Sequence, residues 1–179
     1  MDLSKFKTSD WLKVGGAVLM LIAGFLTWWQ PDCGGIAECE AFVDAAGLDV
    51  TAFDLTFSGL FPWILLVAIG ILTFLSASGL FKLPANIPAP LIFLVASAYS
   101  ALFVIGRLLI DPYEGDVSDA VERGIGLYLA VVAVIAVLAG SYMGFKESGG
   151  DLGDLTDMDK MKGSFGGGST PPPPPPPAG

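Results

Sequence analysis

The sequence contains no histidine and is poor in charge. The missing imidazole excludes histidine general bases, histidine ligation of haem or zinc, and Ser-His-Asp triads. Only 15% of the 179 residues are charged, against about a quarter in an ordinary soluble domain. The charges leave four uncharged runs, at 14–31, 55–81, 83–106 and 124–145. Intramembrane catalysis and proton-coupled transport usually need ionisable groups inside such runs. We therefore expect a protein that is not an enzyme, with no catalytic residue, cofactor or metal site.

The four uncharged runs are apolar and long enough to cross a membrane. A hydrocarbon core of about 30 Å needs roughly 20 residues of helix. The second run reads Ile64-Leu65-Leu66-Val67-Ala68-Ile69, without the polar alternation of a barrel strand. A soluble bundle would need polar helix faces, which the runs lack. We predict an all-α membrane protein, in which residues 11–145 form a four-helix transmembrane bundle with helices at about 11–30, 59–80, 90–110 and 123–144.

The basic residues are distributed unevenly between the two sides of this bundle. Lysines lie in the lead at 1–10, at the start of the first helix, in the turn at Lys82 and after the fourth helix. Arg107 and Arg123 border the other side, and residues 14–81 hold no lysine or arginine. The positive-inside rule then predicts a multi-pass protein of the plasma membrane with both termini in the cytoplasm. Trp28 and Trp29 are expected in the outer aromatic belt.

The segment after the fourth helix changes in composition. Residues 146–162 are acidic, 163–170 are rich in glycine and serine, and 171–177 are an unbroken proline run. Such a segment cannot bury enough apolar surface to fold alone, so we predict a disordered cytoplasmic tail at 146–179. The prolines should form a polyproline II rod that either binds the aromatic groove of a protein partner or acts as a spacer. The candidate partner-binding residues are Pro171, Pro172, Pro173, Pro174, Pro175, Pro176 and Pro177.

Cys33 and Cys39 are the two cysteines, and both fall in the first external loop, at 31–58. On an oxidising face this pair predicts a disulfide that closes a small loop around Gly34 and Gly35. One alternative is redox catalysis, for which four-helix membrane oxidoreductases use a second thiol pair. The other is that both cysteines are free thiols.

Arg107 is the one charge inside an otherwise apolar stretch, about one turn before Asp111. We expect it to reach the outer interface and form an ion pair with Asp111, or with Glu122 at the start of the fourth helix. Contact with an anion or a lipid headgroup is the alternative.

The two external loops are acidic. Their carboxylates indicate either a solvated surface or a vestibule that collects cations or a basic partner. Their spacing does not fit a calcium-binding loop, and the absence of a basic patch argues against nucleic acid as a partner. The residues are Asp32, Glu38, Glu40, Asp44, Asp49, Asp54, Asp111, Glu114, Asp116, Asp119 and Glu122.

Small residues indicate how the helices pack. Ala136, Gly140 and Gly144 recur every four residues of the fourth helix, a pattern that allows close helix–helix approach. The contact is expected within the bundle, with a homo-oligomer face as the alternative. Ser97, Tyr99 and Ser100 form a polar stripe on the third helix, which is the one candidate for a substrate pathway.

Several short motifs resemble those of small four-helix membrane proteins of actinobacteria. They are Ser9-Asp10-Trp11-Leu12, Gly24 to Trp29, Ala52-Phe53-Asp54 and Gly59 to Trp63, within residues 9–145. This resemblance implies the four-helix fold and transfers no catalytic residue. The Trp28-Trp29, Cys33 and Cys39 arrangement is similar to the claudin-like external loop but lacks its Gly-Leu-Trp spacing.

Together these features favour a non-enzymatic membrane scaffold or accessory subunit. Its expected partners are membrane lipids, other membrane proteins and a protein that binds the proline-rich tail. A small transport or channel component with an acidic outer vestibule is the alternative.

Overall fold

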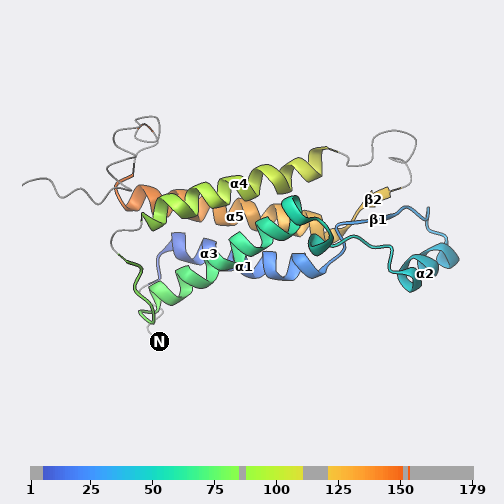
Figure 1. Cartoon of the computed structure of the whole chain (residues 1–179), viewed down its shortest axis with the longest axis horizontal. Coiled ribbons are helices and arrows are strands. Elements are labelled where there is room, and N and C mark those ends of the chain that lie inside the picture. The colour runs from blue at the N-terminus through green and yellow to red at the C-terminus, as the bar shows by residue number, and fades with distance from the viewer. Residues whose placement is uncertain (1–5, 85–87, 111–120, 151–152, 154–179) are drawn as a thin grey trace, which may run out of the picture.

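The computed structural model describes residues 6–84, 88–110, 121–150 and 153. Four long helices dominate it (Figure 1): α1 (Thr8–Phe25), α3 (Phe61–Ala77), α4 (Ala89–Leu109) and α5 (Ile125–Glu147). All four are long and apolar enough to cross a membrane, α3 together with the turn that precedes it. The prediction of a mostly helical chain with four membrane-length apolar helices is therefore confirmed.

The four helices run alternately up and down in one bundle. α1 packs against α5 and α3, and α4 packs against the same two helices. We call the end where α1 and α4 begin and α3 and α5 end the Lys13 end. The opposite end, which carries the short elements, is the α2 end (Figure 1). The interhelical core is apolar, with Met20, Leu66, Val104 and Val134 fully buried.

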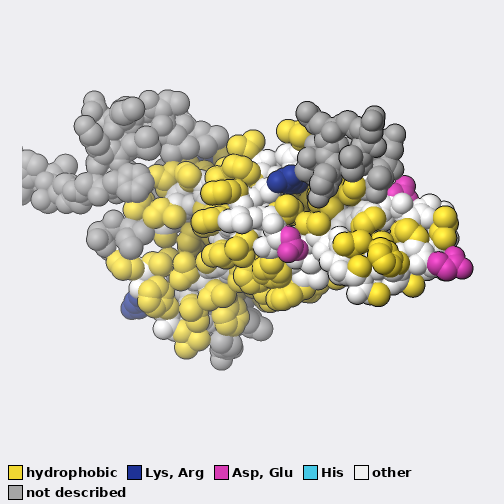
Figure 2. Space-filling view, turned by 45° about the vertical axis from the view of Figure 1, so that its right-hand side comes forward, with side chains coloured by type: hydrophobic (Ala, Val, Ile, Leu, Met, Phe, Trp, Pro, Cys, Tyr) yellow, Lys and Arg dark blue, Asp and Glu magenta, His cyan; other side chains and the backbone are white. Residues whose placement is uncertain are grey.

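Apolar side chains also cover much of the outer surface of the bundle (Figure 2). Among the exposed ones are Val18, Ile71, Leu102 and Ile135, one from each long helix. Helices that are apolar all round need lipid or further protein around them. The bundle therefore has the surface expected of helices that lie in a membrane.

The first helix ends earlier in the sequence than predicted. It stops at Phe25, not near residue 30, because the chain continues as the strand β1 (Trp29–Pro31). β1 pairs antiparallel with β2 (Val121–Arg123), a small sheet that the all-α prediction did not include. Trp28 Nε1 donates to the Ala23 carbonyl at 2.9 Å and so caps the last turn of α1. Trp28 and Trp29, the second of which is the first residue of β1, were expected in an aromatic belt, but both are buried.

The segment predicted as the first external loop is largely structured. It contains the helix α2 (Ala37–Ala46), the 3-10 turn η2 (Ala52–Asp54) and the π-helical turn η3 (Thr56–Leu60), which runs into α3. Gly47 ends α2 in the left-handed conformation, φ 62°, which glycine adopts without steric cost. Together with η3, the second long helical span starts at Thr56, earlier than the predicted 59, although α3 itself starts at Phe61. It ends at Ala77, earlier than the predicted 80.

The predicted tail lies almost wholly outside the described residues. α5 continues to Glu147, so the first two residues assigned to the tail belong to the last helix. Residues 151–152 and 154–179, including Pro171 to Pro177, are not described. The fourth helix starts at Ile125 and not at 123, because residues 121–123 form β2.

Candidate functional sites at the two ends of the bundle

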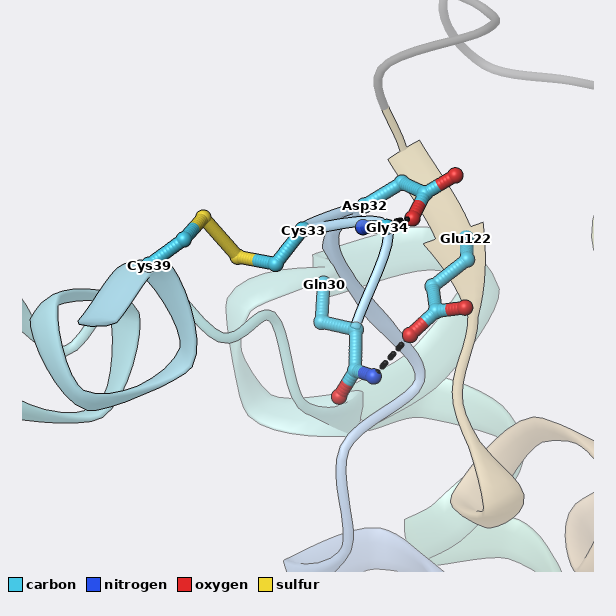
Figure 3. Close-up of a disulfide and its surroundings, with 6 residues drawn as sticks. All are labelled: Gln30, Asp32, Cys33, Gly34, Cys39 and Glu122. Atoms are coloured by element: carbon cyan, nitrogen blue, oxygen red, sulfur yellow. Dashed lines mark hydrogen bonds between the residues drawn. A yellow bond between two sulfur atoms is a disulfide. The ribbon is translucent and has the colours of Figure 1, made fainter. Parts of the chain in front are cut away.

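A small lobe projects from the α2 end and consists of residues 32–50, which we call the α2 lobe (Figure 1). The structure joins Cys33, before the helix, to Cys39 in its first turn (Figure 3). Their Cα atoms lie 5.6 Å apart, within the range of protein disulfides. The bond fixes the start of α2 to the chain that leaves β1.

Both ends of the α2 lobe are tied to the bundle. At its start, Gln30 Nε2 donates to Glu122 Oε1 between the two strands (Figure 3). At its end, Val50 forms a bridge with Trp29: the Val50 N–H donates to the Trp29 carbonyl at 2.8 Å, and the Trp28 N–H donates to the Val50 carbonyl at 2.8 Å. The lobe is thus tied to β2 at its start and to the two buried tryptophans at its end.

The α2 lobe presents an acidic surface with exposed apolar side chains. Val43 is the buried residue of α2, whereas Phe42 is 66% exposed and Ile36 and Leu48 are also exposed. Glu38, one turn before Phe42, is exposed on the same face. A cleft of about 230 Å³ beside the disulfide is lined by the carboxylates of Asp32, Glu40, Asp44, Asp49 and Glu122. Among the described residues, no group of three or more acidic side chains or cysteines lies close enough together to hold a metal ion.

A second cavity, of about 460 Å³, opens at the Lys13 end, and we call it the Lys13 pocket. All four long helices contribute to it. Its walls include Asp10 and Lys13 from α1, Thr73 from α3, Phe93 from α4, and Ser141 and Glu147 from α5. Polar side chains of α1, α3 and α5 therefore converge, beside Phe93 of α4, at the place where the bundle ends.

Lys13 is the charged residue most deeply placed in this pocket, with 7% of its surface exposed. Its Nζ lies 3.0 Å from Asp10 Oδ1 and 5.9 Å from the centre of the Phe93 ring. Gly144 of α5 leaves room for the amine, since an added Cβ would come within 3.4 Å of Nζ. From the sequence, Lys13 was predicted only as one of the lysines on the cytoplasmic side of the bundle. The feature of the sequence that could have indicated its ion pair is Asp10, one helical turn before Lys13.

The rest of the pocket is polar but incompletely bonded. At the rim, Glu147 Oε2 accepts from Ser9 Oγ at 3.3 Å and lies 3.1 Å from Lys7 Nζ. Thr73 and Ser141 are only 4% and 1% exposed, and their hydroxyls have no hydrogen-bond partner among the described residues. Burying a hydroxyl without a hydrogen-bond partner costs free energy, so the burial of these two hydroxyls requires an explanation.

Arg107, at the α2 end, has a partner other than the predicted Asp111 and Glu122. Its Nε donates to Ser58 Oγ of η3 at 2.8 Å. Asp111, the predicted ion-pair partner, lies outside the described residues. Glu122, the alternative partner, accepts instead from Gln30. Arg107 therefore links α4 to the turn that starts α3.

The three small residues of α5, predicted to form one packing face, have different surroundings. Gly140 is buried against α1, where an added Cβ would come 2.7 Å from the Ser9 carbonyl oxygen. Gly144 faces the Lys13 pocket, and Ala136 is half-buried. The face of closest approach also includes Ala133 and Val137, which meet Gly16 of α1.

The two serines of the polar stripe bond within the third long helix, whereas the Tyr99 hydroxyl donates to the Phe57 carbonyl of η3 at 3.5 Å. Ser97 Oγ donates to the Leu94 carbonyl at 3.0 Å, and Ser100 Oγ donates to the Ala96 carbonyl at 2.9 Å. Both serines are fully buried. Their hydroxyls are therefore satisfied within α4, without a solute.

Comparison of the chain with protein-family models, with curated proteins and with solved structures finds no match in any of the three. Function therefore has to be inferred from the chemistry of the two ends of the bundle.

Proposed function

We propose that the protein is a non-enzymatic membrane scaffold or accessory subunit, and that its α2 lobe docks a basic segment of a partner membrane protein. The observation that carries this proposal is Phe42. It is a large aromatic side chain, 66% exposed, on a helix held by a disulfide outside the four apolar helices.

The position of Phe42 fits a binding anchor. Aromatic side chains are enriched among the residues that dominate interface energies. Apolar side chains gather on the α2 lobe between acidic ones (Figure 2), and Ile36 and Leu48 flank the helix at its two ends. Because β1, Val50 and the disulfide hold the lobe in place, little order would have to be gained on binding.

The charge of the lobe selects the partner. Glu38, Glu40 and Asp44 are exposed around Phe42, and residues 32–50 contain no lysine or arginine. A partner segment with basic residues beside an apolar side chain complements this surface, and complementary charge speeds and orients association.

The membrane placement is part of the proposal. We infer a multi-pass protein of the plasma membrane, with the Lys13 end and both termini in the cytoplasm. Lys7, Lys13, Lys82 and Lys146 gather at that end, while Arg107 and Arg123 lie at the other, as the positive-inside rule requires. A membrane-impermeant thiol reagent should label Asp44→Cys, but not Ser148→Cys, in intact cells in a background lacking Cys33 and Cys39. The reverse pattern would contradict this orientation.

The proposed docking can be tested on the full chain. The protein is purified from native membranes in a gentle detergent, its stoichiometric partner is identified, and the binding of the two purified proteins is measured. Phe42→Ser should weaken binding by tenfold or more, about 1.4 kcal/mol, as expected of an interface anchor. Glu38→Lys with Asp44→Lys should weaken it further and reduce its dependence on salt.

Two controls separate the α2 lobe from other surfaces. Leu80→Ser changes an exposed apolar residue at the Lys13 end and should leave binding unchanged. A chain truncated after Gly150 keeps all four helices and should also bind. Loss of binding on truncation, with no effect of Phe42→Ser, would place the contact in the tail and contradict docking on the α2 lobe.

A further inference from the structure

We propose that the Lys13 pocket binds the phosphate group of a membrane phospholipid. The proposal concerns the opposite end of the bundle from the α2 lobe and does not depend on whether that lobe has a partner. It rests on three polar residues that line one cavity, Lys13, Thr73 and Ser141, and whose donor groups are incompletely bonded among the described residues.

The first step is the inventory of donors in the pocket. An ammonium group offers three N–H donors, and the acceptor that the described residues give Lys13 is Asp10 Oδ1, at 3.0 Å. Thr73 and Ser141 add two hydroxyls, more than nine-tenths buried and without a partner among the described residues. A phosphate group has several strong acceptor oxygens and satisfies such a set of donors from three different helices.

The start of α4 adds to this preference for an anionic group. Ala89 and Pro90, the first two residues of the helix, line the same pocket. α4 has 21 residues, and its N-cap residue, Pro88, makes no side-chain cap. Pro90 has no N–H to donate, but the N-terminal end of such a helix carries a partial positive charge, which favours phosphate.

The balance of charge in the pocket favours a lipid over free phosphate. Lys7 and Lys13 are offset by Asp10 and Glu147, so the pocket has little net attraction for a small doubly charged anion. Phe93, Leu83 and Ala77 form an apolar part of the wall, which suits the glycerol and first methylenes of a lipid. The pocket also lies at the end of the apolar helices, where headgroups lie if the helices span a membrane.

The binding is measured with the full chain, purified in detergent and freed of native lipid. The probes are short-chain phosphatidylethanolamine, short-chain phosphatidylglycerol, diacylglycerol of the same chain length, and inorganic phosphate. Both phospholipids should bind, and diacylglycerol should bind at least tenfold more weakly, because it lacks the phosphate oxygens that would accept these hydrogen bonds.

Thr73→Val is the decisive variant. It keeps the shape of the side chain and removes a hydroxyl that has no partner in the described structure, so the chain should fold at least as well as the unaltered one. Its affinity for both phospholipids should nevertheless fall by about tenfold. Ser141→Ala should act in the same direction, and Lys13→Met should weaken binding most where it folds.

Matched controls exclude general effects of charge and of buried serine. Lys82→Met removes an exposed lysine near the same end but outside the pocket, and Ser100→Ala removes a buried hydroxyl that bonds its own helix. Both should bind phospholipid as the unaltered chain does. Unchanged affinity in Thr73→Val and Ser141→Ala, or an equal loss in Lys82→Met, would overturn the proposal. Diacylglycerol or inorganic phosphate binding as tightly as the phospholipids would overturn it as well.

Discussion

Gly16 of α1 lies directly against Val137 of α5. A Cβ added to Gly16 would come 2.7 Å from Val137 Cγ2 and 2.8 Å from the Ala133 carbonyl oxygen. Real Cβ atoms essentially never come that close to either atom. Ala133 and Val137 are fully buried, so neither can turn away into solvent. The two helices therefore meet at this glycine with backbone almost touching side chain, as small residues allow in helix pairs.

This contact predicts that Gly16→Ala destabilises the bundle. The added methyl group has to push α1 and α5 apart, and overpacking of this kind costs about 1–3 kcal/mol. The unfolding free energy in mild detergent, measured by denaturant titration, should fall by that amount.

Gly15→Ala is the matched control for Gly16→Ala. Gly15 is the preceding residue of the same helix, and an added Cβ would meet nothing within 4 Å. The change should stabilise α1 slightly, by about 0.5–1 kcal/mol, because glycine is costly inside a helix. If the two variants had the same stability, α1 and α5 would not meet as described.

The Cys33–Cys39 disulfide predicts a local loss of order when it is removed. With both cysteines replaced by serine, the α2 lobe should lose about 2 kcal/mol of stability, the value expected for so short a loop. Hydrogen exchange should speed up at α2 amides and stay unchanged in α1 and α5, because the long helices pack independently of the lobe.

The oxidation of this pair has its own measurement. Both cysteines of the native protein should resist alkylation until a reductant is added. Alkylation before reduction would show free thiols, which was one of the alternatives that the sequence left open.

The four long helices could be predicted from the sequence because length and apolar composition are local properties. The runs at 55–81 and 124–145 contain most of α3 and α5. The end of α1 could not be predicted in the same way. Residues 26–28 are as apolar as the helix before them, yet they leave it because β1 pairs with residues 121–123, far along the chain. A pairing of only three residues leaves too short a pattern to recognise.

The sites at the two ends of the bundle also differ in how far the sequence could predict them. The cysteine pair lies within seven residues of sequence, so its proximity followed from spacing. The Lys13 pocket depends on Thr73, Phe93 and Ser141, which come from three other helices. A lysine at the border of an apolar run usually marks a helix end in water. Its burial here follows from how closely α1 and α5 pack near Gly140 and Gly144, which no single segment reveals.

Arg107 and Ser58 predict a measurable coupling between α4 and the start of α3. Arg107 Nε donates to Ser58 Oγ at 2.8 Å, and Ser58 is buried. Arg107→Met should destabilise the bundle by about 1–3 kcal/mol, because it removes a charged hydrogen bond and leaves the hydroxyl unpaired. A double-mutant cycle with Ser58→Ala should give a coupling of about 1 kcal/mol, measured by unfolding in detergent. Additive effects of the two changes would show that the bond contributes nothing.

Asp54 predicts how the turn before α3 responds to acid. Asp54 Oδ2 accepts the Thr51 N–H and the Thr51 hydroxyl, both at 2.8 Å. The backbone bond, followed by the hydroxyl bond, holds the pKa of Asp54 below its ordinary value of 3.8. The stabilisation is therefore complete above pH 3.8 and is lost as the pH falls through the lower, folded-state pKa. Exchange protection of the Thr51 amide should fall over that range in the native protein and stay nearly constant in Asp54→Asn. An Asp54 pKa at or above 3.8, measured by NMR titration, would mean that this carboxylate does not hold the turn.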